Sequence, residues 1–144
     1  MIRIVRAPVR IDFAGGTTDI YPFTHRYGGC VLNAAINRYV KGRLVSTVDN
    51  TKLSYDANIP TGSGLGTSSA MNVVWLALVS QIKDKKKIAD TVYRLEQDMG
   101  IVGGKQDQYA AAFGGINFLR FEKDKVVREQ LNLDKKVLKN LQSS

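Results

Sequence analysis

The chain has very few residues of the kinds that form disulfides or bind transition metals. It contains one cysteine, Cys30, and one histidine, His25, among 144 residues. A single cysteine excludes an internal disulfide, and the lack of a Cys/His cluster argues against a zinc site. The first residues, 2–6, alternate like a strand and do not resemble a secretory leader. We therefore expect a cytoplasmic protein.

Several common motifs are also missing. Without a Gly-x-Ser-x-Gly elbow, acyl transfer by a serine triad has little support. The glycine-rich stretch at residues 60–70 has no lysine after its last glycine, so it is not a Walker A loop, and Thr67 stands where a dinucleotide fingerprint needs a glycine. The apolar run at residues 71–79 is too short to span a membrane.

The composition fits one globular domain with an ordinary core, because 44% of the residues are hydrophobic. The net charge of +8 allows either nucleic acid or an anionic small molecule as the ligand. Basic residues cluster only at 83–87, between two expected helices, where a solvated connector is the simplest explanation. Repeats and low-complexity segments are absent from the sequence.

Strand patterns dominate the first third of the chain, and helical patterns follow. Residues 2–6 and 9–14 form two expected strands interrupted by Pro8, and residues 29–36 and 39–48 form two more with a junction at Asn37 and Arg38. Residues 52–55 are expected to pair back. Helices are predicted at 67–82, 85–99 and 109–113, a hairpin at 116–122 and 126–130, and a last helix capped by Asp134.

The stretch Pro60–Ala70 reads PTGSGLGTSSA and leads directly into an apolar helix. Its glycines let backbone N–H groups approach a ligand closely, and the start of a helix has free N–H donors and partial positive charge. Together these features predict a phosphate-binding loop. A plain helix N-terminus with a flexible lead-in is the simpler alternative.

Phosphoryl transfer also needs a metal site and a group that receives the acceptor proton. A hydroxyl from Thr67, Ser68 or Ser69 together with Glu96 would suit Mg²⁺, which prefers hard oxygen ligands. Asp107 could meet an acceptor hydroxyl, and Arg10 or Lys105 could keep it ionised or contact phosphate.

Each of these residues also has an ordinary structural explanation. Glu96 could be a surface carboxylate paired with Arg94 or lysines, and Asp107 could cap a helix at 108–113. Arg10 could belong to a strand-edge ion pair, and Asp19 could form an Asx turn.

Three segments in combination resemble the GHMP family of small-molecule kinases. They are Ala7–Asp19 (APVRIDFAGGTTD), Pro60–Ala70, and Gly103–Gln108 (GGKQDQ). The first and third look closest to the D-glycero-D-manno-heptose 7-phosphate kinase branch, whose members phosphorylate the anomeric hydroxyl of a sugar phosphate with ATP. The resemblance implies an α+β fold in two layers, a mixed or antiparallel sheet with packed helices, like the second domain of a ribosomal small-subunit protein.

The resemblance also implies roles for individual residues. Asp107 would be the catalytic aspartate that takes or orients the acceptor proton, Arg10 would lie near the transferred phosphoryl, and Ser68 and Glu96 would hold Mg²⁺. Gly16, Thr17 and Asp19, which we group with Lys105, would bind the acceptor. The phosphates of ATP would be wrapped by Gly62, Ser63, Gly64, Leu65, Gly66, Thr67, Ser68 and Ser69.

Members of this family are roughly twice as long, as expected for two domains. Residues 1–144 therefore look like the amino-terminal ATP-binding domain, without the C-terminal domain. An expressed fragment, a split-gene product and a relic are all open. We expect a partner chain that supplies the other half, or self-association. The acceptor could be a sugar phosphate, a free sugar or another polyol. The competing hypothesis is a non-catalytic domain that binds nucleic acid or a protein through its positive charge.

Overall fold

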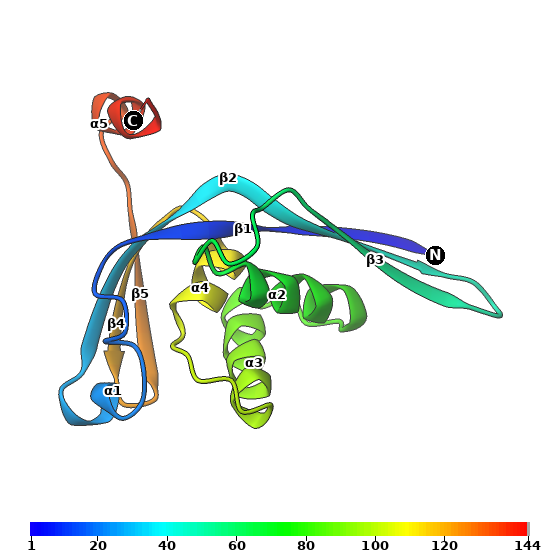
Figure 1. Ribbon diagram of the computed structural model, residues 1–144, viewed down its shortest axis with the longest axis horizontal. Helices are drawn as coiled ribbons and strands as arrows, with labels where there is room; N and C mark the ends of the chain where they lie inside the picture. Colours follow the sequence, from blue (N-terminus) through cyan, green and yellow to red (C-terminus); the bar gives the residue numbers. More distant parts are fainter. Residues whose placement is uncertain (144) are drawn as a thin grey trace.

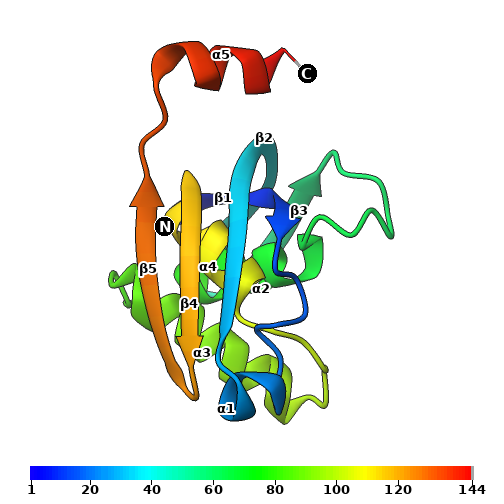
Figure 2. The ribbon, with the colours of Figure 1, turned by 90° about the vertical axis from the view of Figure 1, so that its left-hand side faces the viewer.

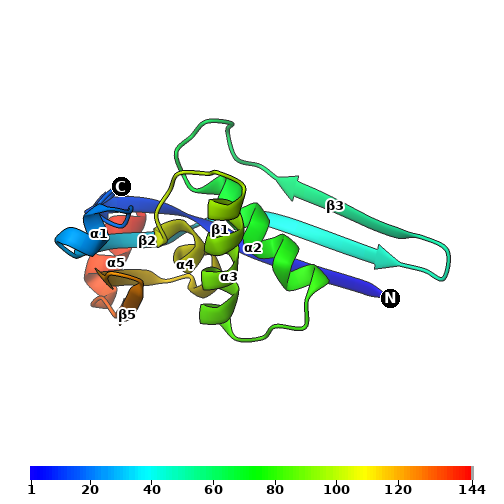
Figure 3. The same cartoon turned by 90° about the horizontal axis from the view of Figure 1, so that it is seen from below.

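A five-stranded antiparallel sheet carries most of the helices on one of its faces (Figures 1 and 3). The structure is a computed structural model and describes residues 1–143. In chain order the elements are β1 (Ile2–Ala14), α1 (Phe23–Arg26), β2 (Gly29–Ser46), β3 (Thr51–Ala57), α2 (Thr67–Val79), α3 (Lys85–Asp98), α4 (Gln106–Phe113), β4 (Ile116–Glu122), β5 (Lys125–Leu131) and α5 (Lys135–Gln142).

The sheet is organised around β2, which is 18 residues long. β1 runs along one side of it, while β3 and β4 share the other side, and β5 extends the sheet beyond β4. The predicted breaks at Pro8 and at Asn37 and Arg38 were wrong, because β1 and β2 are each continuous. An irregularity between Pro8 and Arg10 absorbs the extra residues of β2. Pro8 is tolerated because β1 is an edge strand.

Helix α2 lies directly on the sheet. A Cβ atom at Gly42 of β2 would lie 2.4 Å from Val74 Cγ1 and 2.7 Å from Leu78 Cδ1, so only glycine permits this close approach. The main core forms between α2 and the inner faces of β1 and β2. The strands contribute Ala7, Val9, Val40 and Leu44 to it. Helix α2 is not buried on all sides, since Trp75 is 39% exposed.

Helix α3 has almost the predicted bounds, and the side chain of its N-cap residue, Asp84, accepts a hydrogen bond from the N–H of Lys87. The apolar side chains that recur at helical spacing along α3 are only partly buried. Ile88 and Val92 lie in the core, whereas Leu95 and Met99 are 37% and 63% exposed. The exposed pair lines a pocket described below.

The last elements follow the sequence prediction closely. The hairpin of β4 and β5 pairs as expected, and Asp134 caps α5 by accepting the N–H of Lys136. Helix α5 stands clear of the sheet (Figure 2), and its apolar residues Val137, Leu138 and Leu141 are 47%, 38% and 45% exposed. Within residues 1–143, no helix is long and apolar enough to cross a membrane.

Candidate active site

The glycine-rich loop has the backbone of an anion-binding nest. Gly62, Gly64 and Gly66 have φ values of 70°, 69° and 75°, while Ser63 and Leu65 between them keep negative φ. Such alternation turns successive N–H groups toward one side of the loop, where they can surround an anion. Gly66 is also the N-cap residue of α2, and no side chain caps this helix. The first N–H groups of α2 therefore add to the same positive concavity.

Arg10 connects this loop to the start of α4. Its backbone N–H donates to Leu65 O at 3.0 Å, and its Nη1 donates to Gly64 O at 2.7 Å. Its Nε and Nη2 both lie 2.7 Å from Asp107 Oδ1, across 97 positions of sequence. The Arg10 guanidinium thus connects its own segment, Ala7–Asp19, to both Pro60–Ala70 and Gly103–Gln108.

Asp107 lies in the first turn of α4 and faces the glycine loop. The N-cap of α4 is Lys105, so the alternative in which Asp107 caps the helix was wrong. A Cβ atom at Gly66 would lie 2.9 Å from Asp107 Cγ, which places the carboxylate directly beneath the loop. Burial raises the pKa of Asp107, although the charge and hydrogen bond of Arg10 oppose the rise. A carboxylate with a raised pKa is a better proton acceptor than an exposed one.

Glu96 is buried between α3 and the start of α2, with 5% of its surface exposed. Its Oε1 accepts from Asn72 Nδ2 at 2.9 Å, and its Oε2 accepts from Ser69 Oγ at 3.2 Å and from Gln108 Nε2 at 2.5 Å. The alternative of a surface carboxylate was therefore wrong. Glu96 falls four residues after the buried Val92, which turns it toward α2 and away from solvent.

The residues around Glu96 suit a single Mg²⁺ ion that also binds phosphate. Carboxylate and hydroxyl oxygens are the hard ligands that Mg²⁺ prefers, and Mg²⁺ usually takes only one or two from the protein. The Thr67 hydroxyl is buried and lacks a hydrogen-bond partner in the described part of the chain. Ser69, not Ser68, contacts Glu96, while Ser68 is exposed in the first turn of α2. No group of three or more acidic, His or Cys residues within 1–143 could cage a metal alone.

A second predicted group of residues comes together beside Asp107. Gly16, Thr17 and Asp19, from the segment after β1, line a pocket of about 280 Å³ with Arg10 and Asp107. We call this the acceptor pocket. Asp12, Ile20, Gly103, Gly104 and Gln106 complete its lining.

Lys105 does not join this group of residues. Its Nζ donates to Asp124 O at 2.9 Å and lies 4.9 Å from the ring of Tyr93. The lysine therefore points toward α3 and the β4–β5 turn.

The floor of the acceptor pocket contains Asp19, which the resemblance placed there, and Asp12, which sequence reasoning passed over. Asp19 is 4% exposed, and its Oδ2 accepts the backbone N–H of Gln106 at 3.1 Å. This long-range bond replaces the local Asx turn considered as its alternative. Burial raises the pKa of Asp19 despite this bond, and the nearby charge of Asp12 adds to the rise. Asp12 and Gln106 belong to the quoted segments, but nothing in their spacing marked them as neighbours.

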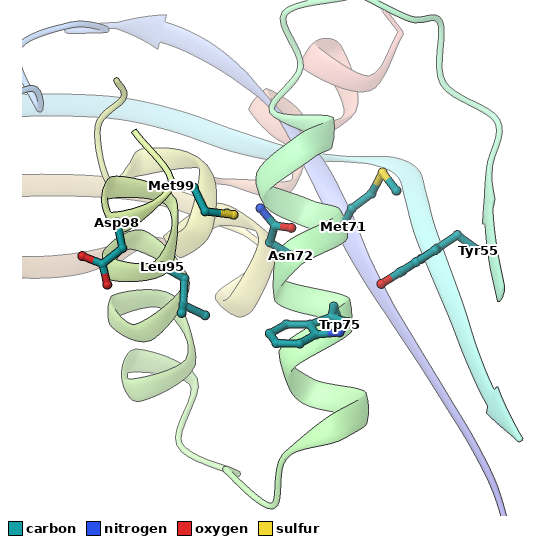
Figure 4. A pocket seen from close by; sticks show the side chains of 7 residues that line it. All are labelled: Tyr55, Met71, Asn72, Trp75, Leu95, Asp98 and Met99. Carbon is teal, nitrogen blue, oxygen red and sulfur yellow. The ribbon is translucent and has the colours of Figure 1, made fainter. Parts of the chain in front are cut away.

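A mainly apolar pocket of about 410 Å³ lies beside Asn72 (Figure 4). Its side chains gather between α2, the C-terminal part of α3 and β3, and they are Tyr55, Met71, Asn72, Trp75, Leu95, Asp98 and Met99. Asn72 belongs both to this pocket and to the hydrogen bonds of Glu96. A flat apolar group bound here would therefore lie next to the metal-binding candidates.

Comparison with known proteins identifies the family. The sequence profile of the GHMP kinases N terminal domain matches residues 30–115, which include the glycine loop, Glu96 and Asp107. The chain belongs to the GHMP kinase family. It is 32% identical over 177 aligned positions to a D-glycero-alpha-D-manno-heptose 7-phosphate kinase of Campylobacter jejuni, covering 85% of this chain and 51% of that protein. A bifunctional fucokinase/GDP-fucose pyrophosphorylase of Arabidopsis thaliana is 31% identical, with 79% of this chain and 16% of that protein covered.

Solved structures agree with this membership of the GHMP kinase family. A crystal structure of a D-glycero-D-manno-heptose 1-phosphate kinase from Bacteroides thetaiotaomicron superposes with a TM-score of 0.91 at 28% identity, covering 100% of this chain and 64% of that one. The mevalonate kinase of Methanococcus jannaschii shares the fold, with a TM-score of 0.66 at 12% identity, and covers 92% of this chain and 56% of its own. The chain thus spans 51% to 64% of the length of the heptose phosphate kinases and the mevalonate kinase, and 16% of the bifunctional fucokinase.

Proposed function

We propose that this chain is the nucleotide-binding part of an ATP-dependent kinase that phosphorylates a hydroxyl of a sugar or sugar phosphate. One observation carries the proposal: the glycine loop, Asp107 and the acceptor pocket meet around the side chain of Arg10. Phosphoryl transfer needs a phosphate cradle and a proton acceptor on either side of the transferred group. The heptose phosphate kinases and fucokinase among the relatives support a sugar as the acceptor.

In this proposal Asp107 accepts the proton of the attacking hydroxyl. Its position beneath Gly66 puts it next to the phosphate loop, and its raised pKa favours proton uptake as the hydroxyl attacks. Arg10 keeps Asp107 in place and brings positive charge close to the loop, where the transferred phosphoryl would lie. The N–H groups of residues 62–69 bind the phosphates of ATP.

Ser68 and Glu96 are the proposed protein ligands of Mg²⁺, and Ser69 orients the Glu96 carboxylate. When bound, the ion neutralises charge on the phosphates of ATP. Ser68 is preferred to Ser69 because its hydroxyl is exposed, whereas the Ser69 hydroxyl already donates to Glu96. The apolar pocket beside Asn72 would receive the adenine ring, since aromatic and thioether side chains suit a flat base.

We also propose that a second half completes the active site, in the cytoplasm. One cross-strand row on the outer face of the sheet is apolar throughout and consists of Ile11, Ala34, Ile116 and Leu131. Ile11 is 41% exposed, and the apolar side of α5 is exposed as well. Such surfaces normally pack against another domain or chain. The extra length of the relatives supports a covalent or separate C-terminal half as the occupant.

The direct test is calorimetric titration of the chain with Mg·ATP, followed by an assay of phosphoryl transfer once the second half is supplied. The expected result is saturable binding of ATP that depends on Mg²⁺. No such binding is expected when GTP or RNA replaces ATP. A chain that binds RNA and other polyanions without nucleotide preference, with affinity falling steeply as salt rises, would instead be the non-catalytic binding domain. That outcome would overturn the kinase proposal.

A further inference from the structure

A pocket of about 240 Å³ lies on β1, β2 and the end of β3, away from the proposed active site. Its lining consists of Arg6, Asn37, Arg38, Tyr39, Lys41, Asp56 and Asn58, and we call it the outer pocket. Ala7 and Val40 point into the core, on the face of the sheet that carries α2, α3 and α4 (Figure 1). Side chains alternate along a strand, so Arg6, Tyr39 and Lys41 point to the opposite face.

The outer pocket lies at the bulge between β1 and β2. Pro8 pairs with Tyr39, and Arg10 pairs with Ala35. Between these two pairs, one residue of β1 faces three residues of β2. The extra residues break the regular alternation of the strand, and residues 37, 38 and 39 are all exposed. The bulge therefore gathers an amide, a guanidinium and an aromatic ring at one place on the surface.

Positive charge dominates the lining of the outer pocket. It has three cations and one carboxylate, Asp56, and therefore a net charge of +2. Within residues 1–143, Arg6, Arg38 and Lys41 form no ion pair, although Lys41 and Asp56 are register partners on β2 and β3. Arg6 Cζ lies 4.6 Å from the centre of the Tyr39 ring, which holds this guanidinium at the pocket. Cations around one hollow repel one another, and an anion between them would remove that repulsion.

A phosphate monoester matches the outer pocket in charge and shape. A guanidinium can bind two phosphate oxygens at once, and a monoester carries a charge of about −1.5 to −2 at pH 7, which balances the lining. Asn37, Asn58 and Asp56 suit hydroxyl groups on the organic part of such a ligand. A nucleic acid has one charge per phosphate and needs cations spread along a surface, whereas these cations surround a small hollow.

We propose that the outer pocket is a second ligand site, which binds a small phosphate monoester bearing hydroxyl groups through Arg6, Arg38 and Lys41. It is separate from the proposed active site, because none of its lining residues lines the acceptor pocket or the apolar pocket. The inference goes beyond the proposed function and does not require the chain to bind ATP.

The test is an NMR titration of the whole chain with glycerol 3-phosphate in about 0.15 M salt, followed through the backbone amide signals. The signals of residues 38–41 should shift in a saturable way, and glycerol should leave them unchanged. Arg38→Gln and Lys41→Gln should each lower the affinity by about fivefold or more, because each removes one of the three cations. Both side chains are exposed, so the signals of the core should stay as in the wild type.

Arg43→Gln is the matched control. It removes the same charge from an exposed position of β2, two residues beyond Lys41, but lies outside the pocket lining. Its affinity for glycerol 3-phosphate should stay within about twofold of the wild type, because salt screens charges that do not touch the ligand. Equal losses of affinity in Arg38→Gln and Arg43→Gln would reveal a diffuse response to net charge and would overturn the inference.

The location of the shifts separates this inference from the kinase proposal. Shifts at residues 62–66 report phosphate in the glycine loop, whereas those at residues 38–41 report the outer pocket. Unmoved signals at residues 38–41 would overturn the inference. So would tighter binding there of a hexaglutamate peptide or an RNA oligonucleotide, since either would assign the outer pocket to a macromolecule. Failure of Mg·ATP to bind would remove the kinase proposal alone.

Discussion

Replacing Gly66 with alanine tests whether the glycine loop and Asp107 form one site. Gly66 has φ +75°, and its added Cβ would lie 2.9 Å from Asp107 Cγ and 3.1 Å from Asp107 Oδ2. The carboxylate must then move away from the loop, and its contacts with Arg10 are lost or weakened. Gly62 is the matched control, since its φ is +70° and an added Cβ meets nothing within 4 Å. Both variants carry the same backbone strain, and only one displaces Asp107.

The expected magnitudes differ accordingly. A left-handed backbone conformation costs a non-glycine residue about 1 kcal/mol, so Gly62→Ala should lower the free energy of unfolding by about that much. Gly66→Ala should also lose a charge-assisted interaction, worth about 2 kcal/mol for groups as buried as these. The side chains of Arg10 and Asp107 are 13% and 26% exposed, so solvent screens their contact only in part. The total expected loss for Gly66→Ala is about 3 kcal/mol.

Urea unfolding of the two variants, followed by circular dichroism, measures this difference directly. The carboxyl resonance of Asp107 supplies a second measurement. Because the charge of Arg10 lowers the pKa of Asp107 in the native chain, displacement should raise that pKa in Gly66→Ala and leave it unchanged in Gly62→Ala. Equal losses of stability in the two variants, with the same Asp107 titration, would show that the loop and the carboxylate are not coupled.

Three further substitutions test separate parts of the site. Asp107→Asn should lower turnover of the completed enzyme by about 10²-fold or more while Mg·ATP still binds, as measured by a coupled assay and calorimetry. Glu96→Gln should abolish the Mg²⁺ dependence of ATP binding. It should also lower the free energy of unfolding by about 1–3 kcal/mol, because the new side-chain NH₂ group would face the N–H donors of Asn72 and Gln108. Burial raises the pKa of Asp19, so its charged form destabilises the fold, and stability should rise as the pH falls through that raised pKa. Asp19→Asn should therefore raise the melting temperature at neutral pH, with a gain that disappears in acid; a constant gain at every pH would contradict this reasoning.

The local sequence pattern was enough to predict those helices and strands whose hydrophobic periodicity matches the face that they bury. The bounds of α3, the β4–β5 hairpin and the cap at Asp134 all depend on residues within a few positions of one another. The continuous strands β1 and β2 were missed because the bulge near Pro8 is a property of the pair. Taken one strand at a time, Pro8 and the Asn37-Arg38 pair look like strand breaks. Only the register between β1 and β2 shows that the strand pairing continues beyond them.

The burial of Glu96 likewise could not be predicted from the local sequence pattern. Its spacing of four residues from Val92 is compatible with an exposed or a buried carboxylate. Its burial depends on donors from two other helices, Asn72 and Ser69 on α2 and Gln108 on α4. A buried carboxylate is stable only when such donors surround it, and single-helix periodicity does not contain that information.

The first turn of α4 explains how one short segment serves three parts of the site. Gln106, Asp107 and Gln108 are consecutive, and successive residues of a helix point about 100° apart. Gln106 therefore reaches Asp12 and Asp19, Asp107 reaches Arg10, and Gln108 reaches Glu96. Because neighbours on a helix do not face each other, the segment can bond to the acceptor pocket, the loop and the metal candidates at once. Rotating this turn by one residue would move all three contacts together, so the phase of α4 fixes the geometry of the whole site.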